Sequence, residues 1–177
     1  MIIIHAVQKL LNTSGLTAAL YISEPGKEQH LHSWYARLLA TGFPGKLLVL
    51  YVHEPSLMTI VCHGKTIKGT WNSFRERLRH LLQRFHFTNS FIEKEMGQME
   101  GYIVSRTSSK SILGHMNQMV YQLEYQCSRA AGYDAIPLDM LENSMMEYLY
   151  QYGTKFHDYR SPFDYWKQTP GLLSDQS

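Results

Sequence analysis

The sequence predicts an α+β domain: an antiparallel meander sheet with helices packed on one face, plus a helical, aromatic-rich C-terminal arm. Short apolar segments separated by turn signals fill the first part of the chain. Longer segments with helical periodicity follow them. The 177 residues, of which 44% are hydrophobic and 18% are charged, are enough for one packed domain and unlike a disordered chain.

The expected strands lie mostly before the long helices. Residues 2–6 are rich in β-branched side chains, which favour a strand. Residues 47–52 are apolar on both faces, as in a covered central strand. Turn signals at 42–45 and 54–56 join neighbouring segments closely enough for an antiparallel meander. We expect strands at residues 2–6, 33–40, 47–52, 57–62 and 102–104.

The expected helices are marked by caps and by apolar stripes. Thr70 is a candidate cap, and Ser90 with Glu93 has the spacing of a capping box. Ser108 or Ser109 is placed to cap the longest helix. We expect helices at residues 7–12, 70–85, 90–101, 110–131 and 137–153.

The charges are divided unevenly along the chain. Residues 1–133 carry 14 Lys and Arg against 8 Asp and Glu, whereas residues 134–177 carry 3 against 7. The net charges are therefore +6 and −4. We expect an α+β core domain at 1–133 and a C-terminal helix with an aromatic, acidic arm at 134–177.

Basic residues are concentrated in one stretch of twenty residues. Such a cluster could neutralise several phosphates of a nucleic acid. It could also be a solvated helix face, or it could dock the acidic arm or a partner. The candidate nucleic-acid-binding residues are Lys65, Lys68, Arg75, Arg77, Arg79 and Arg84.

The arm is crowded with aromatic residues, eight of them between residues 148 and 166. Beyond Gly153 they follow no helical period, and if exposed they would form a large apolar patch. They either wrap back over this chain's own sheet or anchor a protein partner or a second copy. The candidate interface residues are Tyr152, Phe156, Tyr159, Phe163, Tyr165 and Trp166.

Several classes of protein are excluded by short patterns. Cys62 and Cys127 are too few for a disulfide scaffold or a zinc ribbon, so we expect two free, buried thiols in a reducing cytoplasm. The N-terminus has no signal-peptide pattern, and no apolar run reaches the roughly 20 residues that span a bilayer. We expect a cytoplasmic protein that does not contact a membrane.

Candidate chemistry is sparse. Gly64, Lys65 and Thr66 resemble the end of a phosphate-binding loop, but Thr59 stands where that motif needs glycine. The histidine pair at 30 and 32 has no carboxylate or thiol at a fixed spacing, so we expect no metal site. We also expect no catalytic residue and no cofactor.

One polar loop has the features of an anion site. Arg106 and Lys110 bracket serine and threonine residues at a helix N-terminus, where free N–H groups and the helix dipole favour an anion. A capped loop followed by a core amide is the alternative. The candidate anion-binding residues are Arg106, Ser108, Lys110 and Asn117.

Four stretches carry a resemblance to a known family. They are HAVQKLL at 5–11, SWYARLL at 33–39, KLLV at 46–49 and TSSKSILGHMNQM at 107–119. The sequence resembles a bacterial family of unknown function with CTQKL, SWHANL and NRSVLGSMN-like motifs, over residues 1 to about 126. Ala6, Val7 and Tyr35 depart from those motifs. The resemblance implies a compact α+β domain of bacterial origin and brings no known activity.

We therefore expect a bacterial cytoplasmic interaction protein without enzymatic activity. Its partner would be another protein or a second copy of itself, for instance within a toxin–antitoxin or phage-defence assembly. An enzyme or binder acting on a phosphorylated or nucleotide-like anion is the alternative. A nucleic-acid-binding protein that uses the basic cluster is the second alternative.

Overall fold

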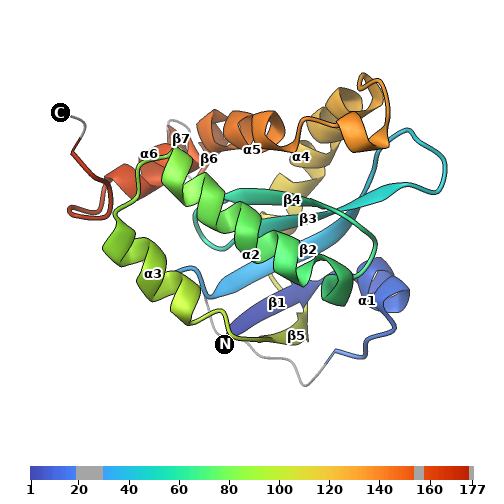
Figure 1. Cartoon of the computed structure of the whole chain (residues 1–177), viewed down its shortest axis with the longest axis horizontal. Coiled ribbons are helices and arrows are strands. Elements are labelled where there is room, and N and C mark those ends of the chain that lie inside the picture. The colour runs from blue at the N-terminus through green and yellow to red at the C-terminus, as the bar shows by residue number, and fades with distance from the viewer. Residues whose placement is uncertain (19–29, 154–157, 176–177) are drawn as a thin grey trace.

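The computed structural model describes residues 1–18, 30–153 and 158–175, which form a layered α/β structure around one main sheet (Figure 1). This sheet has five strands in the order β4-β3-β2-β1-β5. A second sheet consists of the short strands β6 (Tyr150–Gln151) and β7 (Tyr159–Arg160). None of the helices in the described ranges has both the length and the apolar character needed to cross a membrane.

The main sheet is mixed. The strands β2 (Ser33–Ala40), β3 (Leu47–His53) and β4 (Thr59–His63) form the expected antiparallel meander. However, β1 (Ile2–Ala6) lies between β2 and β5 (Tyr102–Arg106) and runs parallel to both. The prediction of a fully antiparallel sheet was therefore wrong. Parallel neighbours need long crossover connections, and the helices between β1, β2 and β5 in the chain provide them.

Helices cover both faces of the sheet, which corrects the expectation of one covered face. The first core lies under α1 (Gln8–Ser14), α2 (Ile67–Arg84), α3 (Asn89–Gly97) and α6 (Pro162–Lys167). The second core lies under α4 (Lys110–Ser128) and α5 (Leu138–Glu147). In Figure 1, α2 crosses in front of the strands. A central strand such as β3, apolar on both faces, requires this double cover.

The helix ends show which of the proposed caps are used. Ser109 caps α4, because its Oγ accepts a hydrogen bond from the Ile112 N–H at 3.2 Å. The cap of α2 is Thr66 and not Thr70, whose buried hydroxyl instead contacts the Tyr51 hydroxyl at 2.7 Å. The cap of α3 is Thr88, so the expected capping box from Ser90 to Glu93 does not form.

The C-terminal residues return to the body of the domain. A capping box between Ser161 and Asp164 starts α6, a helix that was not among those expected from the sequence. This helix places Trp166 in the first core with no exposed surface. Further on, the Thr88 N–H donates to the Leu172 carbonyl at 2.8 Å and ties the end of the described chain to the start of α3. Cys62 and Cys127 are free and buried, as expected.

Truncation after Gly132 should leave a chain that aggregates. The deletion removes α5 from the second core and Trp166 from the first, so that apolar surface of both cores becomes exposed. Light scattering measures the association state. A single substitution, Trp166→Ala, should lower the free energy of unfolding of the full chain by about 3–5 kcal/mol. A truncated protein that stays monodisperse and melts like the full chain would contradict this account.

Candidate functional site

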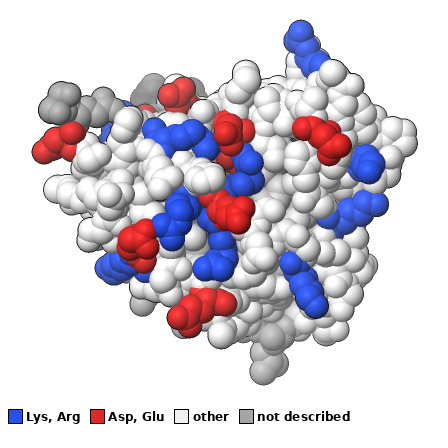
Figure 2. All heavy atoms as spheres, viewed as in Figure 1, with Lys and Arg blue, Asp and Glu red and all other residues white. Residues whose placement is uncertain are grey.

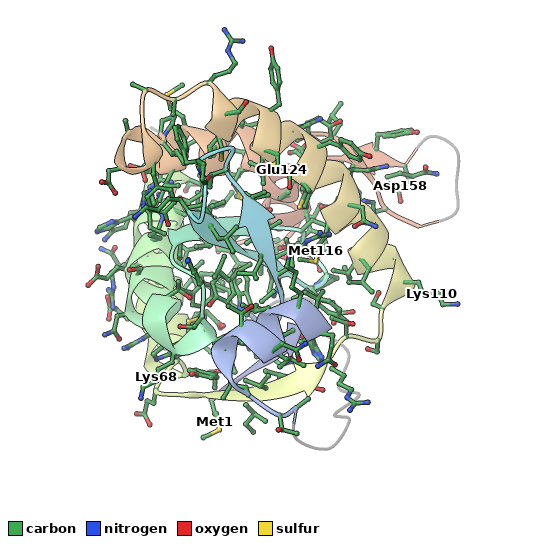
Figure 3. All side chains as sticks on the ribbon, turned by 90° about the vertical axis from the view of Figure 1, so that its right-hand side faces the viewer. Met1, Lys68, Lys110, Met116, Glu124 and Asp158 are labelled. Atoms are coloured by element: carbon green, nitrogen blue, oxygen red, sulfur yellow. The ribbon has the colours of Figure 1, made fainter. Side chains whose placement is uncertain are left out.

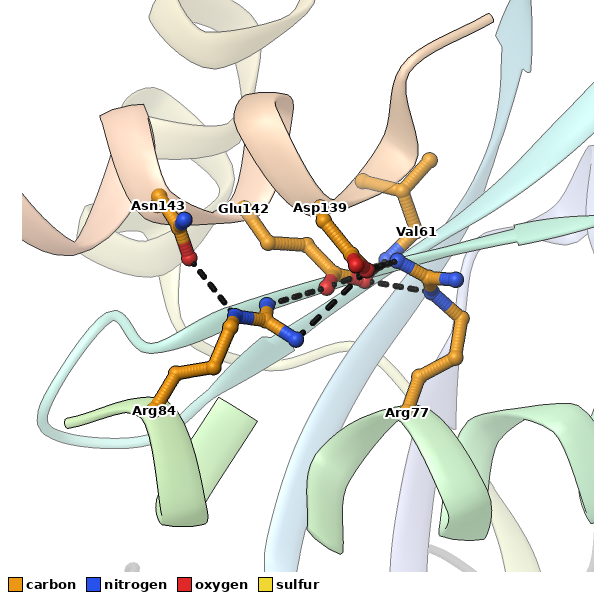
Figure 4. A network of polar contacts seen from close by, with 6 residues as sticks. All are labelled: Val61, Arg77, Arg84, Asp139, Glu142 and Asn143. Atoms are coloured by element: carbon orange, nitrogen blue, oxygen red, sulfur yellow. Dashed lines mark hydrogen bonds and ion pairs between the residues drawn. The ribbon is translucent and has the colours of Figure 1, made fainter. Parts of the chain in front are cut away.

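Two arginines of the basic cluster bind carboxylates of α5 (Figure 4). Arg77 of α2 donates through Nε to Glu142 Oε1 at 2.7 Å and through Nη2 to Asp139 Oδ1 at 2.7 Å. Arg84, two turns further along α2, donates through Nη2 to Glu142 Oε2 at 3.1 Å and through Nε to Asn143 Oδ1 at 3.0 Å. Arg77 and Arg84 therefore behave as expected under one of the alternatives, in which the basic cluster docks the acidic C-terminal residues.

Glu142 is the centre of this network. Its side chain has 0% exposure, and Oε1 also accepts the Val61 N–H of β4 at 3.0 Å. Burial raises the pKa of Glu142, although hydrogen bonds from Arg77, Val61 and Arg84 act to lower it. Burial acts to lower the pKa of Arg77, but contact with Glu142 and Asp139 outweighs it and leaves that pKa raised. Removing a buried carboxylate that accepts hydrogen bonds from three residues strongly destabilises the folded protein, because the donors are left buried without an acceptor.

The remaining basic residues of the cluster do not form a continuous basic surface. Arg79 pairs with Glu93 of α3, and Arg75 is half-buried. Lys65 and Lys68 are exposed at the start of α2. Figure 2 shows basic and acidic side chains interleaved on this side of the molecule instead of a continuous basic surface. Nucleic-acid binding by these residues stays a prediction.

The expected anion-binding residues lie around the start of α4. The Tyr35 hydroxyl accepts the Ser109 N–H at 3.0 Å and contacts Ser108 Oγ at 3.2 Å. Asn117 is exposed, not a core amide, and its Oδ1 accepts a hydrogen bond from Arg37 Nη1 at 2.8 Å. The structure therefore brings Ser108 and Asn117 to side chains of β2, which the sequence analysis had not included in the site.

Arg106 and Lys110 are both exposed near this point. In Figure 3, α4 runs from Lys110 at the edge of the molecule past Met116 to Glu124. The protein itself already uses the Ser109 N–H and the cap hydroxyl of this helix end. Fewer N–H donors are therefore left for an anion than the sequence suggested, and anion binding here stays a prediction.

A buried histidine lies behind the start of α4. His5 of β1 is in register with Tyr35, and their rings stack with centroids 4.8 Å apart. Its Nδ1 lies 3.2 Å from the Arg106 carbonyl oxygen. Burial lowers the pKa of His5, so the ring is uncharged at neutral pH. Three of the stretches that carry the family resemblance, at 5–11, 33–39 and 107–119, thus meet at one place.

A groove lies on the other flank of α4, between this helix and the β6–β7 hairpin. Its volume is about 640 Å³, and tyrosines and amides line it. The exposed fractions are 82% for Tyr121, 57% for Leu149 and 54% for Tyr159. The described lining residues are Ser111, His115, Gln118, Tyr121, Gln122, Tyr148, Leu149, Tyr150, Gln151, Gly153 and Tyr159. We call this feature the tyrosine groove.

A second hollow of about 230 Å³ adjoins the tyrosine groove and shares Ser111, His115, Gln151 and Gly153 with it. It reaches Glu54 in the turn between β3 and β4. Burial lowers the pKa of His115, which keeps the ring uncharged at neutral pH. Glu54 is consequently the only charged side chain among the described residues that line the two hollows.

The expected interface residues are divided between the groove and the interior. Tyr159 lines the tyrosine groove, and Tyr152 lines the second hollow while its hydroxyl donates to the Ser56 carbonyl at 2.6 Å. Phe163 and Tyr165 are half-buried against the first core, where Trp166 is fully buried. Phe156 lies outside the described residues. Phe163, Tyr165 and Trp166 therefore pack onto the chain's own core, which is the first of the two alternatives expected for the aromatic arm.

Tyr121 was missed as a groove residue. The available signal was its position, because a large aromatic side chain stood on the polar side of the expected α4 stripe. Among the described residues, no group of three or more His, Cys, Asp and Glu side chains is placed to hold a metal ion.

A comparison with known families supports the expectation that the chain belongs to a family of unknown function. A family model described as Domain of unknown function (DUF6933) matches residues 3–165. The chain belongs to this family. No curated protein matches it. The DUF6933 match extends past residue 126, where the resemblance was expected to end, and so includes α5, the β6–β7 hairpin and every described lining residue of the tyrosine groove.

Replacing Glu142 by leucine should destabilise the DUF6933 domain by about 3–5 kcal/mol, because two arginines and the Val61 N–H lose their acceptor. Asp139→Asn is the matched control. The Asp139 side chain is 65% exposed, so its replacement should cost less than about 1 kcal/mol. Urea unfolding measures both values. Equal losses for the two variants would show that Glu142 is not the centre of the network.

Tyr35→Phe should lower the free energy of unfolding by about 1–2 kcal/mol, because the Ser109 N–H loses its acceptor. Asn117→Leu should change it by no more than about 0.5 kcal/mol, since the amide is exposed. Thermal unfolding of the two variants side by side tests this ranking. The reverse order would mean that Asn117, and not Tyr35, fixes the start of α4.

Proposed function

We propose that this DUF6933 protein is a cytoplasmic, non-enzymatic interaction protein whose contact surface for a protein partner is the tyrosine groove. The observation that carries the proposal is the exposure of Tyr121, Leu149 and Tyr159 around one hollow. Most other large aromatics of the C-terminal residues are buried or half-buried in the domain. Large exposed side chains gathered around one hollow suit an interaction site, because aromatic anchors supply much of the binding energy at protein interfaces.

The composition of the groove suits protein recognition. Tyrosine combines a large apolar ring with a hydroxyl, and it is enriched among residues that dominate binding energy. The side chains of Gln118 and Gln122 provide amide donors and acceptors on the same flank of α4. This pattern of aromatic anchors beside neutral polar groups resembles the centre and rim of a protein interface.

The alternatives have less support. At the start of α4, Ser109 and Tyr35 use donors that an anion would need. In the basic cluster, Arg77, Arg79 and Arg84 are paired with carboxylates. A phosphorylated or nucleotide-like ligand and a nucleic acid therefore both rank below a protein partner.

The test is to substitute groove tyrosines and compare captured partners. The double variant Tyr121→Ala/Tyr159→Ala should lose a stoichiometric partner that the unchanged protein captures from its native host, as quantified by mass spectrometry. Tyr125→Ala is the matched control, because Tyr125 is exposed on the same helix but does not line the groove. Each anchor is expected to account for about a tenfold loss of affinity or more.

Sedimentation of the same proteins tests a second copy as the partner. If the double variant captures the same partner at the same stoichiometry and keeps the same association state, the proposal is wrong. Melting temperatures must stay close to that of the unchanged protein, which is expected for side chains this exposed.

A further inference from the structure

The main sheet has one covered edge and one open edge. At the covered edge, α5 packs against β4, and Glu142 accepts the outward Val61 N–H at 3.0 Å. At the other edge, β5 pairs only with β1 among the strands of the described ranges (Figure 1). An open edge strand presents unpaired N–H and C=O groups at every second residue, which is a template for pairing with another strand.

The register of β1 and β5 shows which backbone groups face outward. The Ile2 N–H donates to the Gly101 carbonyl at 3.0 Å, and the parallel ladder continues from there with a period of two residues. The backbone groups of Tyr102 and Val104 therefore point away from β1, and neither residue has another backbone partner among those described. Their side chains pack against the first core, whereas Ile103 on the opposite face is 37% exposed.

The strand β5 lacks the features that usually protect an open edge. It contains no proline and no lysine, its pairing with β1 has no bulge, and its one charged residue is Arg106 at the end. Met1, which is 71% exposed, has its methyl group next to Gly101 and lies at the lower border of the molecule in Figure 3. Backbone groups and apolar side chains at this edge thus both favour pairing.

The sequence of β5 is complementary to itself in one antiparallel register. When Val104 of one copy lies opposite Val104 of a second copy, all five residues are paired, and the outward N–H and C=O groups of the two valines meet. Tyr102 then lies opposite Arg106 of the second copy, on the same face of the sheet. The Arg106 side chain is exposed and has no partner among the described residues, so it can form a cation–π pair with the Tyr102 ring.

We propose that the protein forms a symmetric dimer in which two β5 strands pair in antiparallel and join the two main sheets. Because both copies use the same edge, the contact closes on itself, and the covered β4 edges end the joined sheet. The tyrosine groove contains no residue of β5, so this inference goes beyond the proposed function and does not rest on it.

Sedimentation of the full chain measures the assembly. We expect a mass of twice the 20.6 kDa of the chain, with dissociation on dilution. Ile103→Lys places two like charges diagonally across the pair and should raise the dissociation constant about tenfold or more. The matched control is Tyr125→Lys, which adds the same charge at an exposed position of α4 and should leave the dimer intact. A single copy at the highest concentration measured, or equal dimerisation of Ile103→Lys and the control, would overturn the inference.

Proline at residue 104 tests the outward backbone groups. Val104→Pro removes the N–H that faces the second copy and leaves the β1 ladder intact, because this N–H does not donate to β1. The variant should sediment as a single copy. Val104→Thr keeps the N–H and should stay dimeric, and the melting temperatures of both variants verify that they are folded.

Cysteine cross-linking tests the register. At the symmetric position, the two Cα atoms of residue 104 should be about 5.5 Å apart, within the range of a disulfide. The Cα atoms of residue 103 are diagonal neighbours, about 7–8 Å apart, and lie outside that range. Under mild oxidation Val104→Cys should form a covalent dimer and Ile103→Cys should not, although Ile103 is the more exposed residue. The native cysteines are buried. If both variants cross-link equally, or if neither does, the inference is overturned.

The dimer and the tyrosine groove are tested separately. If Tyr121→Ala/Tyr159→Ala dissociates the dimer and Ile103→Lys does not, the two copies meet at the groove and the β5 pairing is wrong. If the unchanged chain is a single copy and Ile103→Lys loses a host protein, a foreign strand occupies β5, which overturns the second copy as the occupant. Neither result depends on whether the groove binds the partner of the proposed function.

Discussion

The position of α5 depends on the buried carboxylate of Glu142. Because β4 is an edge strand, the outward-facing Val61 N–H has no strand partner, and Glu142 accepts it. The same carboxylate holds Arg77 and Arg84 of α2, which covers the opposite core. One side chain thus joins the sheet edge to both helical layers. The β6–β7 hairpin follows α5 directly in the chain, so this contact also fixes one wall of the tyrosine groove.

Local sequence patterns located most of the regular elements. Apolar segments and turn signals identified all five strands of the main sheet, and the stripe from Ile112 to Cys127 identified α4. The same patterns did not show that β1 lies between β2 and β5, because strand order depends on how crossover connections pack. Residues 47–52, apolar on both faces, did carry the information that helices cover both sides of the sheet. That implication was not drawn from the sequence.

The candidate sites were less predictable than the fold because they depend on distant residues. His5, Tyr35 and Ser108 meet only through strand pairing and the start of α4, and no local pattern relates them. The basic cluster was visible, but the carboxylate partners of Arg77 and Arg84 lie about sixty residues away on α5. In contrast, α6 had a local signal that was missed, since Ser161, Pro162 and Asp164 are the residues of a capping box with proline in the first turn.

The double cover of the sheet has a consequence for synthesis on the ribosome. The strands β2, β3 and β4 are made before α4 and α5, so their second face has no cover when they emerge. About 50 residues separate the end of β4 from the start of α4, which corresponds to roughly 2–10 s at about 5–20 residues per second. During that interval the nascent sheet presents Leu48, Leu50 and Val52 to the surroundings. Apolar surface exposed in this way during synthesis favours aggregation of the unfinished chain until α4 and α5 cover it.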